Sequence, residues 1–242
     1  MPNSEGARAN HPSAVESDSF AGYRCPPEVI LLAVRWYLRY GLSYRDVEEL
    51  VAERGIDVDH VTIYRWVQRF TPLLIDAARP CRHAVGDRWF VDETFLKVNG
   101  VWRYVYRAAD QHGQVIDVYV SKRPNIAAAR HFFETALTGH GRPTEVTTDL
   151  AAPLLSVVDE LIPGAAHDTE QYANNRIEWD HGRLEARLRL MRGLRTDRTA
   201  SIVIRGHAFV QNLRRGHYEL GTEADRKHLR LAAAFDELAA VI

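Results

Sequence analysis

The sequence predicts an α/β fold, an α+β mixed sheet with helices packed on it, preceded by a separate helical unit. Three observations lead to this class. Apolar residues recur at helical spacing between residues 26 and 70, and the pattern changes to strand-like runs from residue 88 to 121. Helical and strand-like runs then alternate along the rest of the chain, as they do in folds that pack helices against a sheet.

Three short helices are expected in the first part of the chain. PPEVILLAVRWYLRYG opens with prolines suited to a first helical turn and stops at Gly41. SYRDVEELVAERG has Ser43 as a possible cap, Asp46 three residues later and Gly55 as its stop. DHVTIYRWVQRF begins after Asp59, which is a good capping residue.

The second and third of these helices have the organisation of a helix-turn-helix, which reads DNA through side chains of its second helix. A small helical bundle that only packs or dimerises would give the same periodicity, so this alternative stays open. The residues expected to face outward and contact DNA are Thr62, Tyr64, Arg65, Gln68 and Arg69.

The strand-like part begins with a meander of three antiparallel strands. Asn99-Gly100 is a strong signal for a two-residue hairpin turn, and His112-Gly113 marks a second turn. A helix from Asn125, a strand at 145–149, a helix at 151–162 and a short strand at 165–170 follow. Further helices are expected from about 174, at 199–216 and at 224–242. Three antiparallel strands followed by helix, strand, helix, strand and helix is the element order of the ribonuclease H-like fold.

Pro72 and Pro80 mark a linker between the helical unit and the sheet. The predicted division is a disordered tail at 1–23, a helix-turn-helix domain at 24–71, a linker at 72–87, a ribonuclease H-like domain at 88–217 and a C-terminal helical tail at 218–242.

Three acids stand at positions that could carry chemistry. Asp92 lies in an otherwise apolar strand, where an acid is costly unless it is paired or binds a cation, although it or its neighbour Glu93 could simply be exposed. Asp149 ends a strand, where functional groups collect, but it could also cap the next helix. Glu178 lies near a helix start, which favours an acid on electrostatic grounds alone. Together, three such carboxylates could hold two Mg²⁺ ions for phosphoryl transfer.

Three motifs follow the helical segments in this order: WFVDETFLKVNGVWRYVYRAAD, VTTD and NNRIEWDHGRL. With these motifs, the chain resembles the insertion-sequence-six family of bacterial DDE transposases over about residues 24–217. The resemblance implies a helix-turn-helix that binds the double-stranded DNA of terminal inverted repeats. It also implies a ribonuclease H-like domain that uses two Mg²⁺ or Mn²⁺ ions to cut DNA and join it to target DNA. The family's catalytic and metal-binding residues fall on Asp92, Asp149 and Glu178, and a homodimer is expected because two DNA ends must be held together.

Three departures from the family pattern support a second hypothesis, a catalytically impaired remnant that acts only in DNA binding or dimerisation. The segment between Asp149 and Glu178 is shorter than usual, Leu150 replaces a common lysine, and Glu185 replaces a usual basic residue. Repulsion between Glu185 and DNA phosphate would oppose binding. The flanking residues Arg183 and Arg187 are expected to contact DNA in its place, and His181, one turn after Glu178, is a possible substrate contact.

Other features narrow the function classes. The net charge of −1 argues against a uniformly basic DNA-coating protein. Cys25 and Cys81 form no CxxC pair and so exclude a zinc ribbon. The N-terminal residues have no apolar signal-peptide core and no run reaches the roughly 20 apolar residues of a membrane span, so a cytoplasmic location is expected. A glycine-rich phosphate loop and a Ser-His-Asp order are also absent from the sequence.

Overall fold

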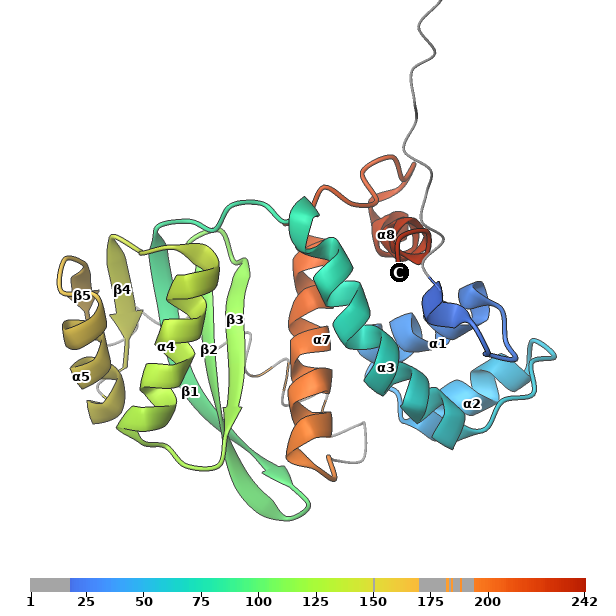
Figure 1. Ribbon diagram of the computed structural model, residues 1–242, viewed down its shortest axis with the longest axis horizontal. Coiled ribbons are helices and arrows are strands. Elements are labelled where there is room, and N and C mark those ends of the chain that lie inside the picture. The colour runs from blue at the N-terminus through green and yellow to red at the C-terminus, as the bar shows by residue number, and fades with distance from the viewer. Residues whose placement is uncertain (1–17, 150, 170–181, 183, 185–187, 189–193) are drawn as a thin grey trace, which may run out of the picture.

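The computed structural model describes residues 18–149, 151–169, 182, 184, 188 and 194–242. A five-stranded sheet lies at one end and a group of helices at the other, with one long helix, α7 (Asp197–Arg215), between them (Figure 1). Among the described residues, no helix is both long enough and apolar enough to span a membrane.

The helical unit contains α1 (Pro27–Arg39), α2 (Tyr44–Ala52) and α3 (His60–Ala78). The predicted caps are confirmed. The Ser43 hydroxyl accepts a hydrogen bond from the Asp46 amide at 3.2 Å, and the Asp46 carboxylate accepts one from the Ser43 amide at 2.7 Å. The Asp59 carboxylate accepts bonds from the first amides of α3 at 2.8 and 2.9 Å.

Helix α3 is longer than the sequence suggested. It continues through Pro72 to Ala78, into the segment predicted as linker, before a 3₁₀ turn, η2 (Arg79–Cys81). The proline signal was misleading because the apolar face continues beyond it: Phe70, Leu74 and Ala78 are fully buried. Their burial outweighs the cost of a proline inside a helix.

The structured chain also starts earlier than predicted. Within the segment assigned to a disordered tail, η1 (Asp18–Phe20) forms a 3₁₀ turn. The Phe20 ring stacks on Phe70 at 4.8 Å between centroids, and Tyr23 packs against the same ring at 5.3 Å. These two aromatic contacts offset the entropy cost of ordering the polar segment around them.

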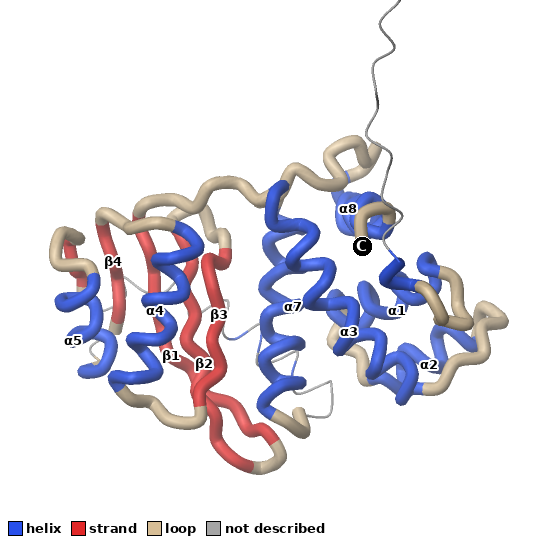
Figure 2. Tube along the Cα trace, viewed as in Figure 1, coloured by secondary structure: helices blue, strands red, loops and turns tan. Residues whose placement is uncertain are grey.

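The sheet is built from β1 (Arg88–Val98), β2 (Val101–Asp110), β3 (Val115–Ser121), β4 (Glu145–Thr148) and β5 (Ala166–Asp168). Their order is β3-β2-β1-β4-β5. The first three strands are antiparallel, and β4 is parallel to both β1 and β5. This mixed topology is the one expected for a ribonuclease H-like fold. Helices α4 (Ile126–His140) and α5 (Ala152–Leu161) cover one face of the sheet (Figure 2).

The predicted hairpin between β1 and β2 is confirmed. Asn99 and Gly100 have φ angles of 50° and 78°, as a two-residue turn that matches strand twist requires. This turn fixes the register of the long β1–β2 ladder, in which Val98 pairs with Val101 and Asp92 with Arg107. The register decides which side chains share a face with Asp92.

The edge strand β3 is covered by polar side chains from outside the sheet. The Asn212 amide of α7 accepts a hydrogen bond from the Val115 N–H and donates one to the Val115 carbonyl, both at 2.8 Å. The Arg82 guanidinium donates to the Val115 and Ile116 carbonyls at 2.6 and 3.1 Å. These bonds satisfy backbone groups that an open edge would expose.

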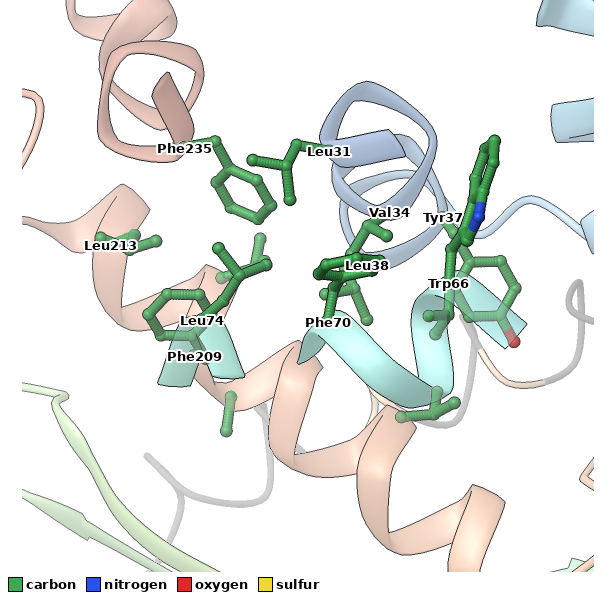
Figure 3. Packing of buried hydrophobic residues seen from close by; sticks show 14 of the residues in the cluster. Leu31, Val34, Tyr37, Leu38, Trp66, Phe70, Leu74, Phe209, Leu213 and Phe235 are labelled. Carbon is green, nitrogen blue, oxygen red and sulfur yellow. The ribbon is translucent and has the colours of Figure 1, made fainter. Parts of the chain in front are cut away.

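A single apolar core joins elements that the sequence assigned to different segments. Side chains of α1, α3, α7 and the C-terminal helix α8 (Arg230–Ala239) meet in it, with Leu38, Phe70, Leu74, Phe209 and Phe235 among them (Figure 3). The same cluster includes Val98 and Val105 of the sheet. Helix α7 therefore packs on both the helical unit and the sheet, and α8, preceded by η3 (Lys227–Leu229), completes the helical side.

Candidate active site

Asp92 lies in the middle of β1, and its carboxylate is half-buried. Side chains alternate along a strand, so Asp92 shares a face with Val98, which belongs to the core around α7. Trp89 and Val91 belong to the opposite core, beneath α4 and α5, and Glu93 shares their face. Asp92 Oδ1 accepts a hydrogen bond from the Glu93 amide at 2.8 Å.

Asp149 is the first residue after β4, and it is exposed overall although its carboxyl group is partly buried. The parallel ladder between β1 and β4 ends with the pair Val91–Thr148, so Asp92 and Asp149 are the next residues of two adjacent strands. Asp149 Oδ1 accepts one bond, of 3.2 Å, from the Ala151 amide. Ala151 itself is the N-cap of α5, so Asp149 is not the helix cap that the sequence left open.

The electrostatics agree with the proximity of these carboxylates. The pKa of Asp149 is raised, first by burial and then by the charge of Asp92, against one hydrogen bond from the Ala151 amide that lowers it. The pKa of Glu93 is also raised, first by burial, and Asp149 and Asp92 add to the effect while the Tyr106 hydroxyl opposes it. Acids that repel one another at a strand end favour a bound cation, which removes the repulsion.

Three described leucines that follow Glu178 in the sequence belong to the core on the face of the sheet to which Asp92 belongs. Leu184 is 2% exposed and lies in the core around α7, and Leu188 packs against that core. Leu194 is in the same cluster, forms a parallel bridge with Val98 and accepts a hydrogen bond from the Asn99 amide at 2.8 Å. Leu184, Leu188 and Leu194 therefore belong to the core on the Asp92 face of β1 and not to the core on the Glu93 face.

Several predicted site residues lie outside the described part of the chain. They are Glu178, His181, Arg183 and Arg187, together with Leu150 and Glu185. Among the described residues alone, no group of three or more His, Cys, Asp or Glu side chains could hold a metal ion. Asp92 and Asp149 are the two predicted ligands among the described residues, and each directly follows the last pair of the β1–β4 ladder.

Arg107 is a neighbour of the site that the sequence interpretation missed. It pairs with Asp92 across the β1–β2 ladder, so both side chains lie on one face, and its own side chain is fully buried. Arg107 Nη2 donates to Gln211 of α7 at 2.5 Å. A signal was present: in a hairpin closed by Asn99 and Gly100, residue 107 falls opposite residue 92. Arg107 is therefore a buried cation on the same face of the sheet as Asp92.

The outward-facing residues predicted on α3 divide into two groups. Arg65 and Arg69 are exposed, and Tyr64 is 36% exposed, with its hydroxyl 3.3 Å from that of Thr199. Thr62 is only half-exposed because its hydroxyl donates to the Asp59 cap. Gln68 turns inward, since its amide nitrogen is buried. The exposed row available to a partner is Arg65 and Arg69, with Val61 one turn before them.

A family model described as a DDE domain matches residues 86–217 of the chain. Among curated proteins, the chain is 37% identical over 165 residues to a transposase for the insertion sequence-like element IS431mec of Staphylococcus aureus. The match covers 66% of this chain and 74% of that protein. The chain is also 36% identical, with the same coverage, to the transposase for insertion sequence element IS257 in transposon Tn4003 of the same species. The chain belongs to the insertion-sequence-six family of DDE transposases.

This membership makes the chain a DDE-type polynucleotidyl transferase by family. Solved structures with some likeness include the catalytic core domain of HTLV-2 integrase in complex with magnesium. That structure has a TM-score of 0.42 and 16% identity, and the match covers 61% of this chain and 97% of that one. An intasome chain of simian T-cell lymphotropic virus has the same TM-score and identity, with 62% of this chain and 56% of that one covered.

Proposed function

We propose that this transposase cuts the ends of its insertion sequence and joins the 3′-hydroxyl to target DNA. Asp92, Asp149 and Glu178 are the catalytic residues in this proposal. The observation that carries it is the neighbouring placement of Asp92 and Asp149, where the β1–β4 ladder ends. The approach of Leu184 and Leu194 to the same face supports Glu178 as the third carboxylate, because Glu178 comes shortly before them in the chain.

The three side chains suit Mg²⁺ or Mn²⁺, which are hard cations that prefer carboxylate oxygens. The pKa of Asp149 is raised by burial and by the charge of Asp92. This supports a cation-binding site, because a bound cation would offset the repulsion between the two acids. We propose that the three carboxylates hold two such ions. When bound, two ions supply activation of the attacking oxygen and stabilisation of the leaving oxygen in an in-line displacement.

Other side chains, on α3 and shortly after Glu178 in the sequence, bind and orient the DNA in this proposal. In this proposal α2 and α3 form the helix-turn-helix that recognises the terminal inverted repeats, with Arg65 and Arg69 as the main contacts and Tyr64 beside them. Thr62 and Gln68 contribute less, because one is engaged with the Asp59 cap and the other turns inward. Arg183 and Arg187 bind phosphate near the reacting strand, and His181 contacts the substrate.

A homodimer is the assembly that this reaction requires. An insertion sequence has two ends, and both must be held while they are cut and joined to one target duplex. We therefore expect two copies of the chain to act together on double-stranded DNA, one copy at each end.

A second candidate function rests on the residues that depart from the family pattern. Glu185 places a negative charge seven residues after Glu178, where the family usually has a basic side chain, and Leu150 replaces a common lysine. Repulsion of the DNA backbone by Glu185 would weaken substrate placement. In that case the chain would bind inverted-repeat DNA and dimerise without joining it.

The two candidates differ in one assay. Purified protein is incubated with labelled duplexes that carry the DNA flanking this gene, with Mg²⁺, Mn²⁺ or EDTA. The proposed function predicts nicking and joining that depend on the metal and disappear in Asp149→Asn and Glu178→Gln, while both variants still bind the duplex.

Binding without any nicking or joining by the wild-type protein in either metal would contradict the proposed activity and leave the DNA-binding function. A Glu185→Lys variant provides the matched comparison. If it restores joining that the wild-type protein lacks, Glu185 is the cause of the impairment.

A further inference from the structure

A basic groove lies between α1, the end of α7 and the start of α8, outside the site described above. It has a volume of about 610 Å³ and none of its lining residues belongs to α3 or to the sheet. Its basic side chains come from three parts of the chain: Arg35 and Arg39 from α1, Arg214 from α7, and Lys227 and His228 from η3. No acidic side chain lines it among the described residues.

The groove concentrates positive charge on a chain whose net charge is −1. On α1, Arg35 and Arg39 are four residues apart and therefore lie on one face of the helix. Lys227 and His228 are exposed across the groove. The pKa of Arg35 is lowered, first by burial and against the charge of Asp236, so part of this charge is held in a half-buried position.

Aromatic rings lie beside these cations. Trp36 of α1 and Tyr40, the residue directly after α1, also line the groove, and Tyr40 is 51% exposed. The Arg39 guanidinium lies over the Tyr40 ring at 5.0 Å, and Arg54 of the α2–α3 connection lies over Trp36 at 4.7 Å. Cations held against rings are pre-oriented and keep N–H groups available for an anionic partner.

We propose that this groove is a second DNA-binding surface that holds the phosphate backbone of a duplex, independently of sequence. The inference rests on the proposed function, because it takes DNA as the substrate. Four cationic side chains and a histidine from three elements exceed what one small anion needs, whereas a phosphodiester chain presents a charge at every nucleotide. Because the groove contains no residue of α3, it binds DNA beyond the segment that α3 reads.

The test measures binding of two labelled duplexes of equal length, one carrying the terminal repeat and one of unrelated sequence, across a salt series. In the Arg39→Ala/Lys227→Ala variant, affinity for both duplexes falls about tenfold. The slope of log affinity against log salt falls by roughly two, as expected for two lost phosphate contacts. An Arg65→Ala/Arg69→Ala variant in α3 instead loses the preference for the repeat.

Controls separate this effect from unfolding and from overall charge. Arg130→Ala/Arg142→Ala removes the same charge from the half-buried Arg130 of α4 and from the exposed Arg142 in the loop after it, and this variant must bind as the wild-type protein does. Arg39→Lys/Lys227→Arg keeps the charge and must keep the salt slope. Thermal unfolding of every variant verifies the fold.

An unchanged DNA affinity and salt slope in Arg39→Ala/Lys227→Ala would overturn the proposal about the groove. An equal loss of DNA affinity in the Arg130→Ala/Arg142→Ala control would overturn it too. Competition with polyglutamate tests whether the groove binds an acidic polypeptide instead of DNA. If the groove variant loses affinity for polyglutamate but not for DNA, the partner is an acidic polypeptide and the proposal is wrong. If the wild-type protein joins DNA and Arg39→Ala/Lys227→Ala binds DNA as tightly as wild type, only the proposal about the groove is wrong. If the wild-type protein binds neither duplex, both proposals are wrong.

Discussion

At the scale of single residues, the structure shows what packs on each face of the strand that carries Asp92 and Glu93. Asp92 and Glu93 are neighbours in one strand, so they point to opposite faces, but which face belongs to the site depends on what packs there. Leu184 and Leu194, both distant in sequence, identify the Asp92 face. The sequence predicts that side chains alternate between the two faces of β1. Which helices and segments cover each face depends on the tertiary fold.

His140, the last residue of α4, makes the stability of the fold dependent on pH. Its pKa is lowered to about 4, first by burial and then by Arg82 and Arg79. Arg82 Nη1 lies 3.2 Å from His140 Nε2, and because an arginine can only donate, the neutral imidazole must accept this bond. Between pH 6.5 and about 4 the unfolded chain binds a proton that the folded chain does not, so the free energy of unfolding falls as pH falls through this window.

The expected contribution of His140 is on the order of 1–2 kcal/mol after allowance for solvent screening. His140→Gln can still accept the bond from Arg82 but does not titrate, so it loses this part of the pH dependence. Urea unfolding at pH 4.5, 5.5 and 6.5 measures the difference between wild-type protein and variant. Parallel curves for the two proteins would show that His140 does not titrate in this way.

At the scale of elements, local signals predicted starts and turns well and one helix end poorly. The Ser43–Asp46 and Asp59 caps and the Asn99-Gly100 turn are short-range features, and they occur where the sequence indicated. Pro72 is also a local signal, but α3 continues past it because the buried Phe70, Leu74 and Ala78 hold the next turn in the core. Burial depends on partners that a local signal does not include.

The contact between α7 and the helical unit depends on a glycine inside α7. A Cβ atom at Gly206 would meet Leu38 Cδ2 and Thr71 Cγ2, each at 2.7 Å. Gly206→Ala should therefore destabilise the protein by about 1–2 kcal/mol, because overpacking of the buried core exceeds the helical preference for alanine of about 1 kcal/mol.

Gly139 in α4 is the matched comparison, since a Cβ there meets nothing within 4 Å. Gly139→Ala should stabilise the protein by a few tenths of a kcal/mol up to about 1. Chemical denaturation of both variants measures the two changes. If Gly206→Ala and Gly139→Ala stabilised the protein to the same extent, α7 would not pack closely on α1 and α3 at Gly206.

At the scale of the whole molecule, the sequence predicted the ribonuclease H-like topology but not how its segments associate. The antiparallel meander and the alternation of helices and strands were predicted, whereas the parallel pairing of β4 with β1 comes from the structure. The shared core of α1, α3, α7 and α8 could not be predicted, because an apolar helix face does not reveal which other face covers it (Figure 3). Helix α7 thereby connects the sheet that carries Asp92 with the helices that carry Arg65 and Arg69.

We infer that Asp92, and not its neighbour Glu93, joins Asp149 in the active site of this transposase. Asp92→Asn and Glu93→Gln remove the same charge from adjacent residues of one strand, so comparing their joining rates in Mg²⁺ tests the claim most directly. The account predicts that Asp92→Asn lowers the rate by more than about 100-fold, the upper range for residues that only orient metal ligands. Glu93→Gln should stay within about tenfold of wild type. A loss in Glu93→Gln as large as that in Asp92→Asn, or joining retained in Asp92→Asn, would contradict the account.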